Sequence, residues 1–164
     1  ITGKLKLDVP GGAPVPLIVA ALGPVMLKLA GRVADGTTTW MTGPKTLEEH
    51  IIPVISSAAK EAGRPSPRIV CGLPIALTTD VDAAREKIAK DLQVYGMLPS
   101  YRAMLDREGV EGPADLALVG DEASLRGSIQ RLRDIGVTDF NAAVMPVADG
   151  VSAATMDLLQ SELG

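Results

Sequence analysis

Residues 17–24 carry the sequence Leu-Ile-Val-Ala-Ala-Leu-Gly-Pro, and this stretch decides the fold class. Its first five residues form an apolar run without polar alternation, which is the pattern of a parallel strand covered on both faces. Gly23 and Pro24 come next, and proline is tolerated in the first turn of a helix. Apolar residues continue at helical spacing from Met26 to Val33. The stretch therefore predicts a buried strand that passes directly into a helix.

The same strand-to-helix pattern repeats along the chain. Three further buried strands are predicted at residues 37–41, 68–78 and 140–145, and a half-exposed strand at residues 4–9. Helices are expected at residues 26–33, 46–63, 82–94, 98–108, 121–135 and 152–163. Thr46 and Glu49 predict a capping box, and Pro53 should kink or restart its helix. Strands that alternate with helices through short links predict an α/β fold with a parallel sheet.

Length and composition limit the architecture. The chain has 164 residues, of which 46% are hydrophobic and 22% charged, so a single globular domain is expected rather than disorder. Two parallel arrangements fit: an open doubly wound sheet, or part of a closed barrel. A complete eight-stranded barrel needs roughly 250 residues, and periodicity alone does not choose between the two.

The composition also excludes several classes of function. Aromatic residues make up only 2% of the chain and the net charge is -4, which argues against nucleic-acid and anionic-membrane partners. Cys71 is the single cysteine, so an internal disulfide and a Cys-rich zinc site are excluded. His50 is the single histidine, which leaves no basis for a multi-histidine metal site. No metal site is predicted.

Three single residues receive individual predictions. Cys71 lies in the middle of a predicted strand and should be an inert, buried thiol. His50 follows Glu48 and Glu49 on a predicted helix and is expected to face solvent. Trp40, the only tryptophan, lies at a strand end; it is expected to fill the core, the alternative being a wall of a ligand pocket.

Four groups of residues resemble the luciferase-like monooxygenase superfamily: residues 16–24, 29–36, 40–44 and 118–121. Residues 95–102 are similar to an actinobacterial subgroup that uses the deazaflavin coenzyme F-420. The resemblance implies the C-terminal half of a (β/α)8 TIM barrel, with parallel strands that correspond to barrel strands five to eight.

Within one partial-barrel domain of residues 1–164, the chain divides into four parts. The predicted parts are a strand and loop lead-in (1–14), phosphate-side strands and helices (15–80), a helical excursion (81–117), and the last helix, strand and C-terminal helix (118–164). The excursion is expected to form a lid or one wall of a substrate pocket.

The predicted anion site lies where strands pass into helices. Glycine lets a ligand approach the backbone, and a helix N-terminus presents unpaired N–H groups that favour a phosphate; a plain tight turn is the alternative. The resemblance implies that these loops bind the coenzyme through Ala21, Leu22, Gly23, Pro24, Met41, Thr42 and Gly43. Lys45 could add a charge. The predicted substrate-binding residues are Tyr95, Tyr101 and Arg102, with plain helix packing as the alternative.

The resemblance further implies hydride transfer between coenzyme F-420 and an organic small molecule. Two alternatives stay open: an FMN-dependent monooxygenase of the same superfamily, and a non-catalytic ligand-binding or assembly domain. The catalytic acid or base is expected in the N-terminal half of the barrel, so no catalytic residue is named. The chain starts at Ile1 rather than Met, which indicates processing or a fragment. A cytoplasmic homo-oligomer without nucleic-acid or membrane partners is expected.

Overall fold

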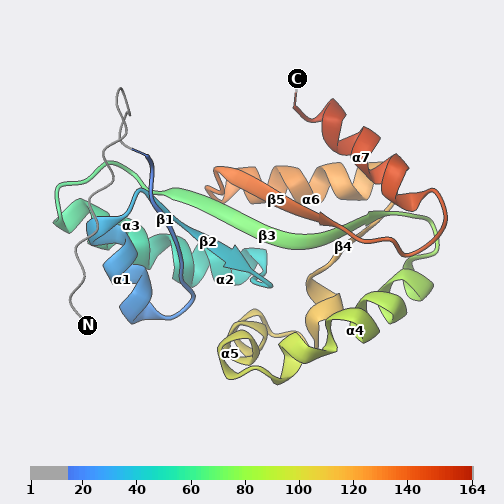
Figure 1. Cartoon of the computed structure of the whole chain (residues 1–164), viewed down its shortest axis with the longest axis horizontal. Helices are drawn as coiled ribbons and strands as arrows, with labels where there is room; N and C mark the ends of the chain where they lie inside the picture. The colour runs from blue at the N-terminus through green and yellow to red at the C-terminus, as the bar shows by residue number, and fades with distance from the viewer. Residues whose placement is uncertain (1–14, 164) are drawn as a thin grey trace.

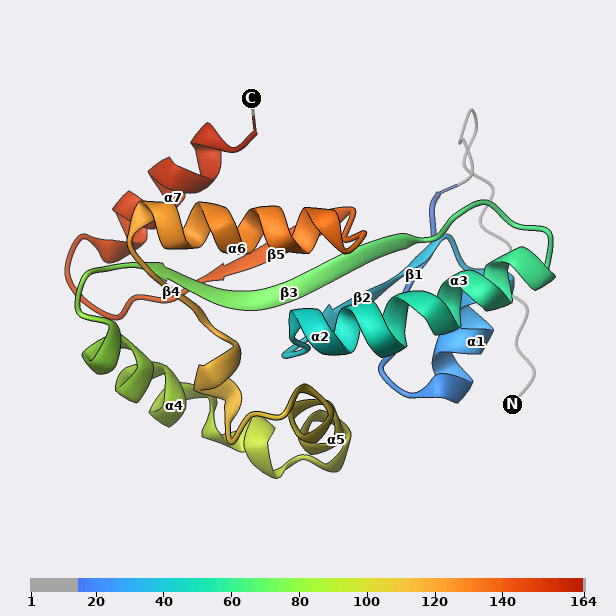
Figure 2. The same ribbon diagram turned by 180° about the vertical axis from the view of Figure 1, so that it is seen from behind.

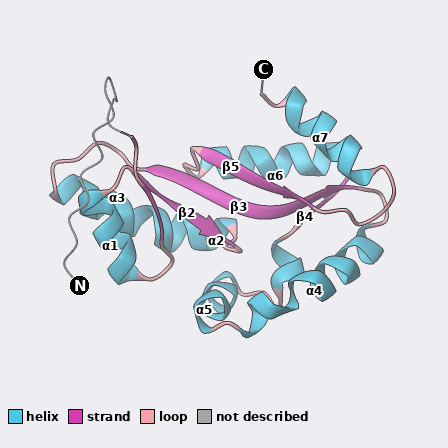
Figure 3. Ribbon diagram, viewed as in Figure 1, coloured by secondary structure: helices cyan, strands magenta, loops and turns pink. Residues whose placement is uncertain are grey.

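The computed structural model describes residues 15–163, which form a parallel five-stranded sheet flanked by helices (Figures 1 and 3). The elements are β1 (Ile18–Ala20), α1 (Pro24–Val33), β2 (Gly36–Trp40), α2 (Pro44–Thr46), the π-helical η1 (Leu47–Ile51), α3 (Ile52–Glu61), β3 (Arg68–Leu77), α4 (Val81–Met97), α5 (Pro99–Glu108), the 3-10 helix η2 (Pro113–Leu116), β4 (Leu118–Gly120), α6 (Glu122–Asp134), β5 (Asp139–Val144) and α7 (Val151–Ser161). The predicted α/β class is confirmed, and the lead-in predicted for residues 1–14 lies outside the described residues.

β3 is the centre of the sheet. β2 pairs with Arg68–Gly72, β5 with Val70–Ile75 and β4 with Ile75–Leu77, all in parallel. A strand has only two edges, and the pairing of β5 overlaps both of the others, so β2 and β4 share the opposite edge. β1 pairs with β2, and β1 and β5 each have one partner strand within the described residues. β4 likewise pairs only with β3, so β1, β4 and β5 each keep one edge without a partner strand there.

The strand β4 corrects the prediction of four core strands. Residues 118–120 were not predicted as a strand, yet they pair with β3 at Ile75–Leu77. The following helix begins as predicted, because the carboxylate of Asp121 accepts a hydrogen bond from the Ser124 backbone N–H at 2.9 Å.

The helix predicted for residues 46–63 differs at its start. It begins at Pro44, with Gly43 as its N-cap, so the capping box predicted for Thr46 and Glu49 is wrong. The helix widens to a π-helix over η1, and α-helical geometry resumes at Ile52. Pro53 lies in the first turn of α3, but Ile51 and Ile52 before it keep helical angles, so the proline does not restart the helix; the predicted kink stays a prediction.

The helical excursion 81–117, which we call the helical arm, contacts the start of α2 through α5. α6 and α7 lie above the sheet in Figures 1 and 2, and α4 and α5 lie below it. The arm is anchored by apolar side chains, since Met104 and Leu105 of α5 are buried in the main core with Met41 and Leu47. Among residues 15–163, no helix combines the length and apolar character that crossing a bilayer requires.

Candidate functional site

The two predicted loops lie at the same edge of the sheet. β1 pairs with β2 in parallel, with Ala20 opposite Thr38, so the loops that follow the two strands emerge side by side. The first loop comprises residues 21–23 and leads into α1; the second comprises residues 41–43 and leads into α2. The carboxyl edge of a parallel sheet is where α/β proteins bind ligands.

The first loop presents an open helix N-terminus. Gly23 is the N-cap of α1, and no side chain of the described part of the chain caps this end. A Cβ atom added at Gly23 would meet no heavy atom within 4 Å. The first-turn amides of α1 are therefore accessible to a ligand, and they carry the partial positive charge of the helix end.

A cavity of about 450 Å³ adjoins this loop. It is lined by Ala20, Ala21, Leu22, Gly23, Met26, Thr38, Thr39, Trp40, Ser100, Tyr101 and Asn141. Four predicted site residues are among them: Ala21, Leu22, Gly23 and Tyr101. We call this space the rim cavity.

The second loop differs because its helix start is already occupied. The Glu108 carboxylate accepts hydrogen bonds from the Lys45 backbone N–H at 3.1 Å, the Thr46 backbone N–H at 2.7 Å and the Thr46 hydroxyl at 2.6 Å. Thr42 is buried, and its hydroxyl donates to the Trp40 carbonyl at 3.3 Å. Met41, Thr42 and Gly43 do not line the rim cavity, and their binding to a coenzyme stays a prediction.

Trp40 and Tyr101 line one side of the rim cavity, while Tyr95, a predicted substrate residue, packs against both rings without lining it. The rings of Trp40 and Tyr95 meet edge to face with centroids 5.9 Å apart, and those of Tyr95 and Tyr101 at 5.0 Å. Trp40 packs against the core and also lines the cavity, so both of its predicted roles describe its position. Its indole N–H is buried and has no hydrogen-bond partner within the described residues. The wall joins β2 to the helical arm.

Arg102 is not brought to this cavity. Its guanidinium donates to the Asp106 carboxylate at 2.8 Å and to the carbonyls of Val110 and Glu111 at 2.9 and 2.7 Å. These contacts fix the turn after α5. A contact between Arg102 and substrate stays a prediction.

His50 corrects a further expectation. It was expected to face solvent, but it is only 7% exposed, and its Nε2 donates to the Leu22 carbonyl at 3.0 Å. The single histidine of the chain thus stabilises the first loop through a hydrogen bond to its Leu22 carbonyl.

Four residues at this site were not predicted from the sequence: Thr38, Ser100, Asn141 and Glu108. Asn141 had a signal, because it is a polar residue inside the otherwise apolar end of β5. Glu108 had no such signal in the sequence, since its hydrogen-bond partners are more than sixty residues away along the chain.

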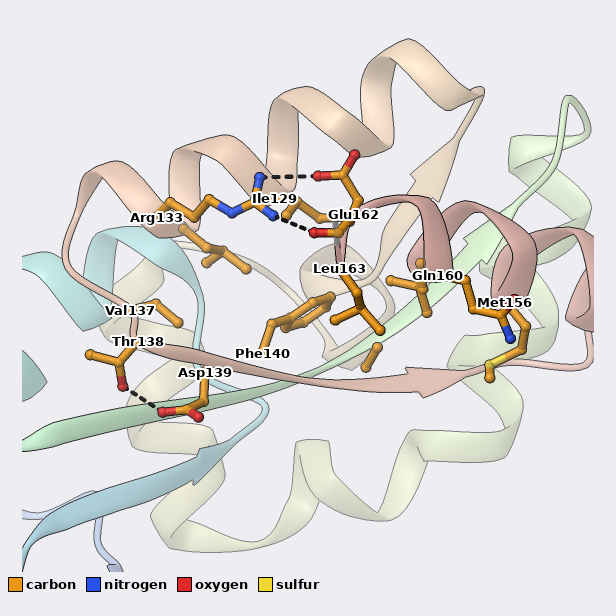
Figure 4. Close-up of a pocket in the computed structure, with 13 residues that line it drawn as sticks. Ile129, Arg133, Val137, Thr138, Asp139, Phe140, Met156, Gln160, Glu162 and Leu163 are labelled. Carbon is orange, nitrogen blue, oxygen red and sulfur yellow. Dashed lines mark hydrogen bonds and ion pairs between the residues drawn. The ribbon is translucent and has the colours of Figure 1, made fainter.

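A second cavity, of about 460 Å³, lies between α6, β5 and α7 (Figure 4). Its walls are mainly apolar, with Phe140 at the floor, and Arg133 donates to Glu162 across one side at 3.0 Å. None of the predicted site residues lines it. The convergence of strand ends favours the rim cavity as the functional site.

The described residues give little scope for metal or thiol chemistry. Within residues 15–163, no group of three His, Cys, Asp or Glu side chains is arranged to hold a metal ion. Cys71 is fully buried as predicted, and burial raises the pKa of its thiol to about 12. Such a thiol is protonated and unreactive at neutral pH.

Comparison with known proteins identifies the family. Residues 5–139 match the luciferase-like monooxygenase family. The chain belongs to this family. Its relatives include the coenzyme F-420-dependent glucose-6-phosphate dehydrogenase of Nakamurella multipartita, 29% identical over 72% of this chain and 34% of the relative. Another is the 5,10-methylenetetrahydromethanopterin reductase of Methanolobus tindarius, 34% identical over 76% of this chain and 38% of the relative.

Solved structures of the luciferase-like family share the fold. The coenzyme F-420-dependent tetrahydromethanopterin reductase of Methanopyrus kandleri superposes with a TM-score of 0.70 at 22% identity. The superposition covers 90% of this chain and 50% of that protein. The chain thus spans a third to a half of the length of these relatives. The predicted half-barrel is confirmed, and β1 and β5 are the strands at which the barrel is open.

Proposed function

We propose that this chain is the C-terminal half of an oxidoreductase that transfers a hydride between coenzyme F-420 and an organic small molecule. The observation that carries the proposal is the open, uncapped start of α1 beside the rim cavity, at the carboxyl edge of a luciferase-like half-barrel. The names of the relatives support the coenzyme, since several are coenzyme F-420-dependent enzymes.

The residues around the first loop fit the phosphate end of such a coenzyme. Gly23 leaves space beside the helix start, and among residues 15–163 no carboxylate lines the rim cavity to repel an anion. Ala21, Leu22 and Gly23 would hold the phosphate through their backbone N–H groups, together with the first-turn amides that follow Pro24, since a proline has no N–H to donate. When bound, the deazaflavin ring would supply the hydride chemistry.

The remaining residues of the rim cavity would shape the substrate pocket. Trp40 and Tyr101 provide apolar surface, while Thr38 and Asn141 provide hydrogen-bonding groups. We propose that the groups that move protons lie in the N-terminal half of the barrel.

Two substitutions at Gly23 test the proposed phosphate site in the full-length protein. The backbone of Gly23 has φ -82° and ψ 154°, which any residue adopts, so both Gly23→Asp and Gly23→Asn are sterically acceptable. Both side chains can cap α1, but only aspartate repels a phosphate. Calorimetry should show coenzyme F-420 binding that is weakened by about tenfold or more in Gly23→Asp relative to Gly23→Asn. Equal affinities of the two variants for coenzyme F-420 would show that the phosphate does not bind at this loop.

The family name favours one competing function, an FMN-dependent monooxygenase. Calorimetry of the same protein with FMN, and oxygen uptake with reduced FMN, distinguish it from the deazaflavin enzyme. If neither coenzyme binds, the chain would instead belong to a non-catalytic domain.

A further inference from the structure

We propose that Glu108 is a positioning residue that fastens the helical arm to the rim of the sheet and thereby sets the position of Tyr101 in the rim cavity. The role of Tyr101 as substrate wall rests on the proposed function. The attachment of the arm by Glu108 does not, and it is tested separately.

The contacts of Glu108 are stronger than an ordinary surface ion pair. One carboxylate oxygen accepts from both the backbone N–H and the hydroxyl of Thr46, at 2.7 and 2.6 Å, and the other accepts from the Lys45 backbone N–H at 3.1 Å. Hydrogen bonds to an ionised acceptor are among the strongest in proteins. The carboxylate also lies at the start of a helix, where the helix dipole favours negative charge.

Gly43 is explained by the position of Glu108. Its backbone, at φ -77° and ψ 169°, is open to any residue, so conformation does not require glycine. The lack of space requires glycine, because a Cβ atom at residue 43 would lie 2.3 Å from Cδ and 2.5 Å from Oε1 of Glu108. Gly43 was predicted to let a coenzyme approach the backbone closely. In the structure, the group that approaches it closely is the side chain of Glu108.

A simple helix cap would not need a residue from the arm. α4 and α6 are capped locally, by Asp80 and Asp121, each of which precedes its helix directly. The cap of α2 comes instead from the last residue of α5, 62 residues further along the chain. Its distinctive effect is to join two elements that are distant in sequence.

The joined helix carries the cavity wall. Ser100 and Tyr101 lie in the first turn of α5, and Glu108 is its last residue. A helix of this length is stiff and about 15 Å long, so fixing one end restricts the other. The Thr46 hydroxyl also lies 3.5 Å from the Met104 carbonyl in the middle of α5. We infer that the Glu108 contact limits how far the aromatic wall moves from Trp40.

Amide hydrogen exchange of the full-length protein tests this role. In Glu108→Ala, the amides of α5 should exchange about tenfold faster or more than in the parent protein, because three hydrogen bonds to a charged group are lost. Glu108→Gln should lie between the two. Glu111→Ala is the matched control, since this carboxylate of the arm makes none of these contacts, and α5 should exchange as in the parent.

Gly43→Asp separates attachment from capping. The new side chain can cap α2 by itself, while its Cβ atom displaces Glu108. If Glu108 positions the arm, α5 exchanges as fast in Gly43→Asp as in Glu108→Ala. Parent-like protection of α5 in Gly43→Asp would overturn the proposal and leave Glu108 as a cap. Should Glu108→Ala fail to fold by circular dichroism, the Gly43→Asp and Glu108→Gln variants decide.

Calorimetry with coenzyme F-420 and with inorganic phosphate gives a second, independent readout. A positioning residue leaves both affinities in Glu108→Ala within about twofold of the parent. A gain of about tenfold would mean that Glu108 competes with an anion at the second loop, which would overturn the positioning role. Absence of coenzyme binding in the parent would contradict the proposed function, while the exchange comparison would still decide the role of Glu108.

Discussion

The imidazole Nε2 of His50 lies 3.0 Å from the carbonyl oxygen of Leu22, and this contact joins the π-helical turn to the loop after β1. A ring nitrogen that faces a carbonyl oxygen must carry the hydrogen, so His50 is the donor. The contact lies directly behind the residues proposed to hold the coenzyme phosphate. It is therefore expected to influence both stability and binding.

Replacement of His50 by alanine should lower the free energy of unfolding by about 1–2 kcal/mol, because the Leu22 carbonyl loses its partner. Coenzyme F-420 affinity should fall as well, since the loop loses its support. Urea unfolding and calorimetry measure the two effects. His50→Gln, which can still donate, should recover part of both, and Glu49→Ala, an exposed position in the same turn, should change neither. Unchanged unfolding in His50→Ala would contradict this account.

Two helical glycines should respond to the same substitution with opposite sign. A Cβ atom at Gly31 of α1 would lie 2.5 Å from the Ile55 carbonyl oxygen and 2.8 Å from the Ala58 Cβ, because α1 and α3 pack closely there. Gly31→Ala should therefore destabilise the protein by about 1–3 kcal/mol. At Gly127 of α6 a Cβ atom meets nothing within 4 Å, so Gly127→Ala should stabilise by about 0.5–1 kcal/mol.

Thermal or urea unfolding of the two alanine variants, side by side, checks this pair. A shift of the same sign in both would show that helix propensity outweighs the close contact of α1 with α3.

The elements that were predicted correctly are those whose pattern is local. β1, β3 and β5 lie in apolar runs bounded by turns, and β2 was identified by its three consecutive threonines, which are β-branched. β4 was missed because its three residues lie between a 3-10 turn and a helix cap, too few to show a period. The half-barrel came from the family resemblance, since periodicity left an open sheet equally acceptable.

The errors at the candidate site have physical causes that a linear sequence does not display. A π-helical turn contains more residues than an α-helical one, so it turns His50 toward the core although Glu48 and Glu49 beside it are exposed. Thr46 was predicted as a cap from its spacing to Glu49, but the carboxylate of Glu108 already satisfies the start of α2. Contacts between distant segments override local capping preferences.

The half-barrel should associate when the 164-residue chain is produced alone. β1 and β5 offer unpaired edges within the described residues, and unprotected edges of this kind promote association. Beside β1, the side chains of Val25, Leu29 and Val33 follow one stripe of α1 and are 78%, 41% and 55% exposed. We expect oligomers or aggregates by light scattering, and relief of association when the N-terminal half of the barrel is co-expressed.

A double variant, Leu29→Lys with Val33→Lys, should raise the monomer fraction, because it removes apolar surface without touching the core. Asp134→Lys, at the exposed end of α6, changes the net charge by the same amount without removing apolar surface and serves as the control for added charge. A stable, soluble monomer of the parent chain would contradict the expectation that these edges need a partner.

Cys71 should make stability depend on alkaline pH. Burial raises the pKa of its thiol from the ordinary 9.0 to about 12. Between these values the unfolded chain releases a proton that the folded chain retains, so the free energy of unfolding falls as the pH rises from about 9 toward 12. The fall of the unfolding free energy with pH should be smaller in Cys71→Ala, and urea unfolding at pH 8 and pH 10 compares the two proteins.

The same thiol should be unreactive in the folded protein. At pH 8 the folded parent should resist iodoacetamide and react only after denaturation, because the attacking species is the thiolate. Rapid alkylation of the folded protein at pH 8 would mean that the thiol is reached by solvent, and that the packing of β3 against its neighbours is looser than the structure shows.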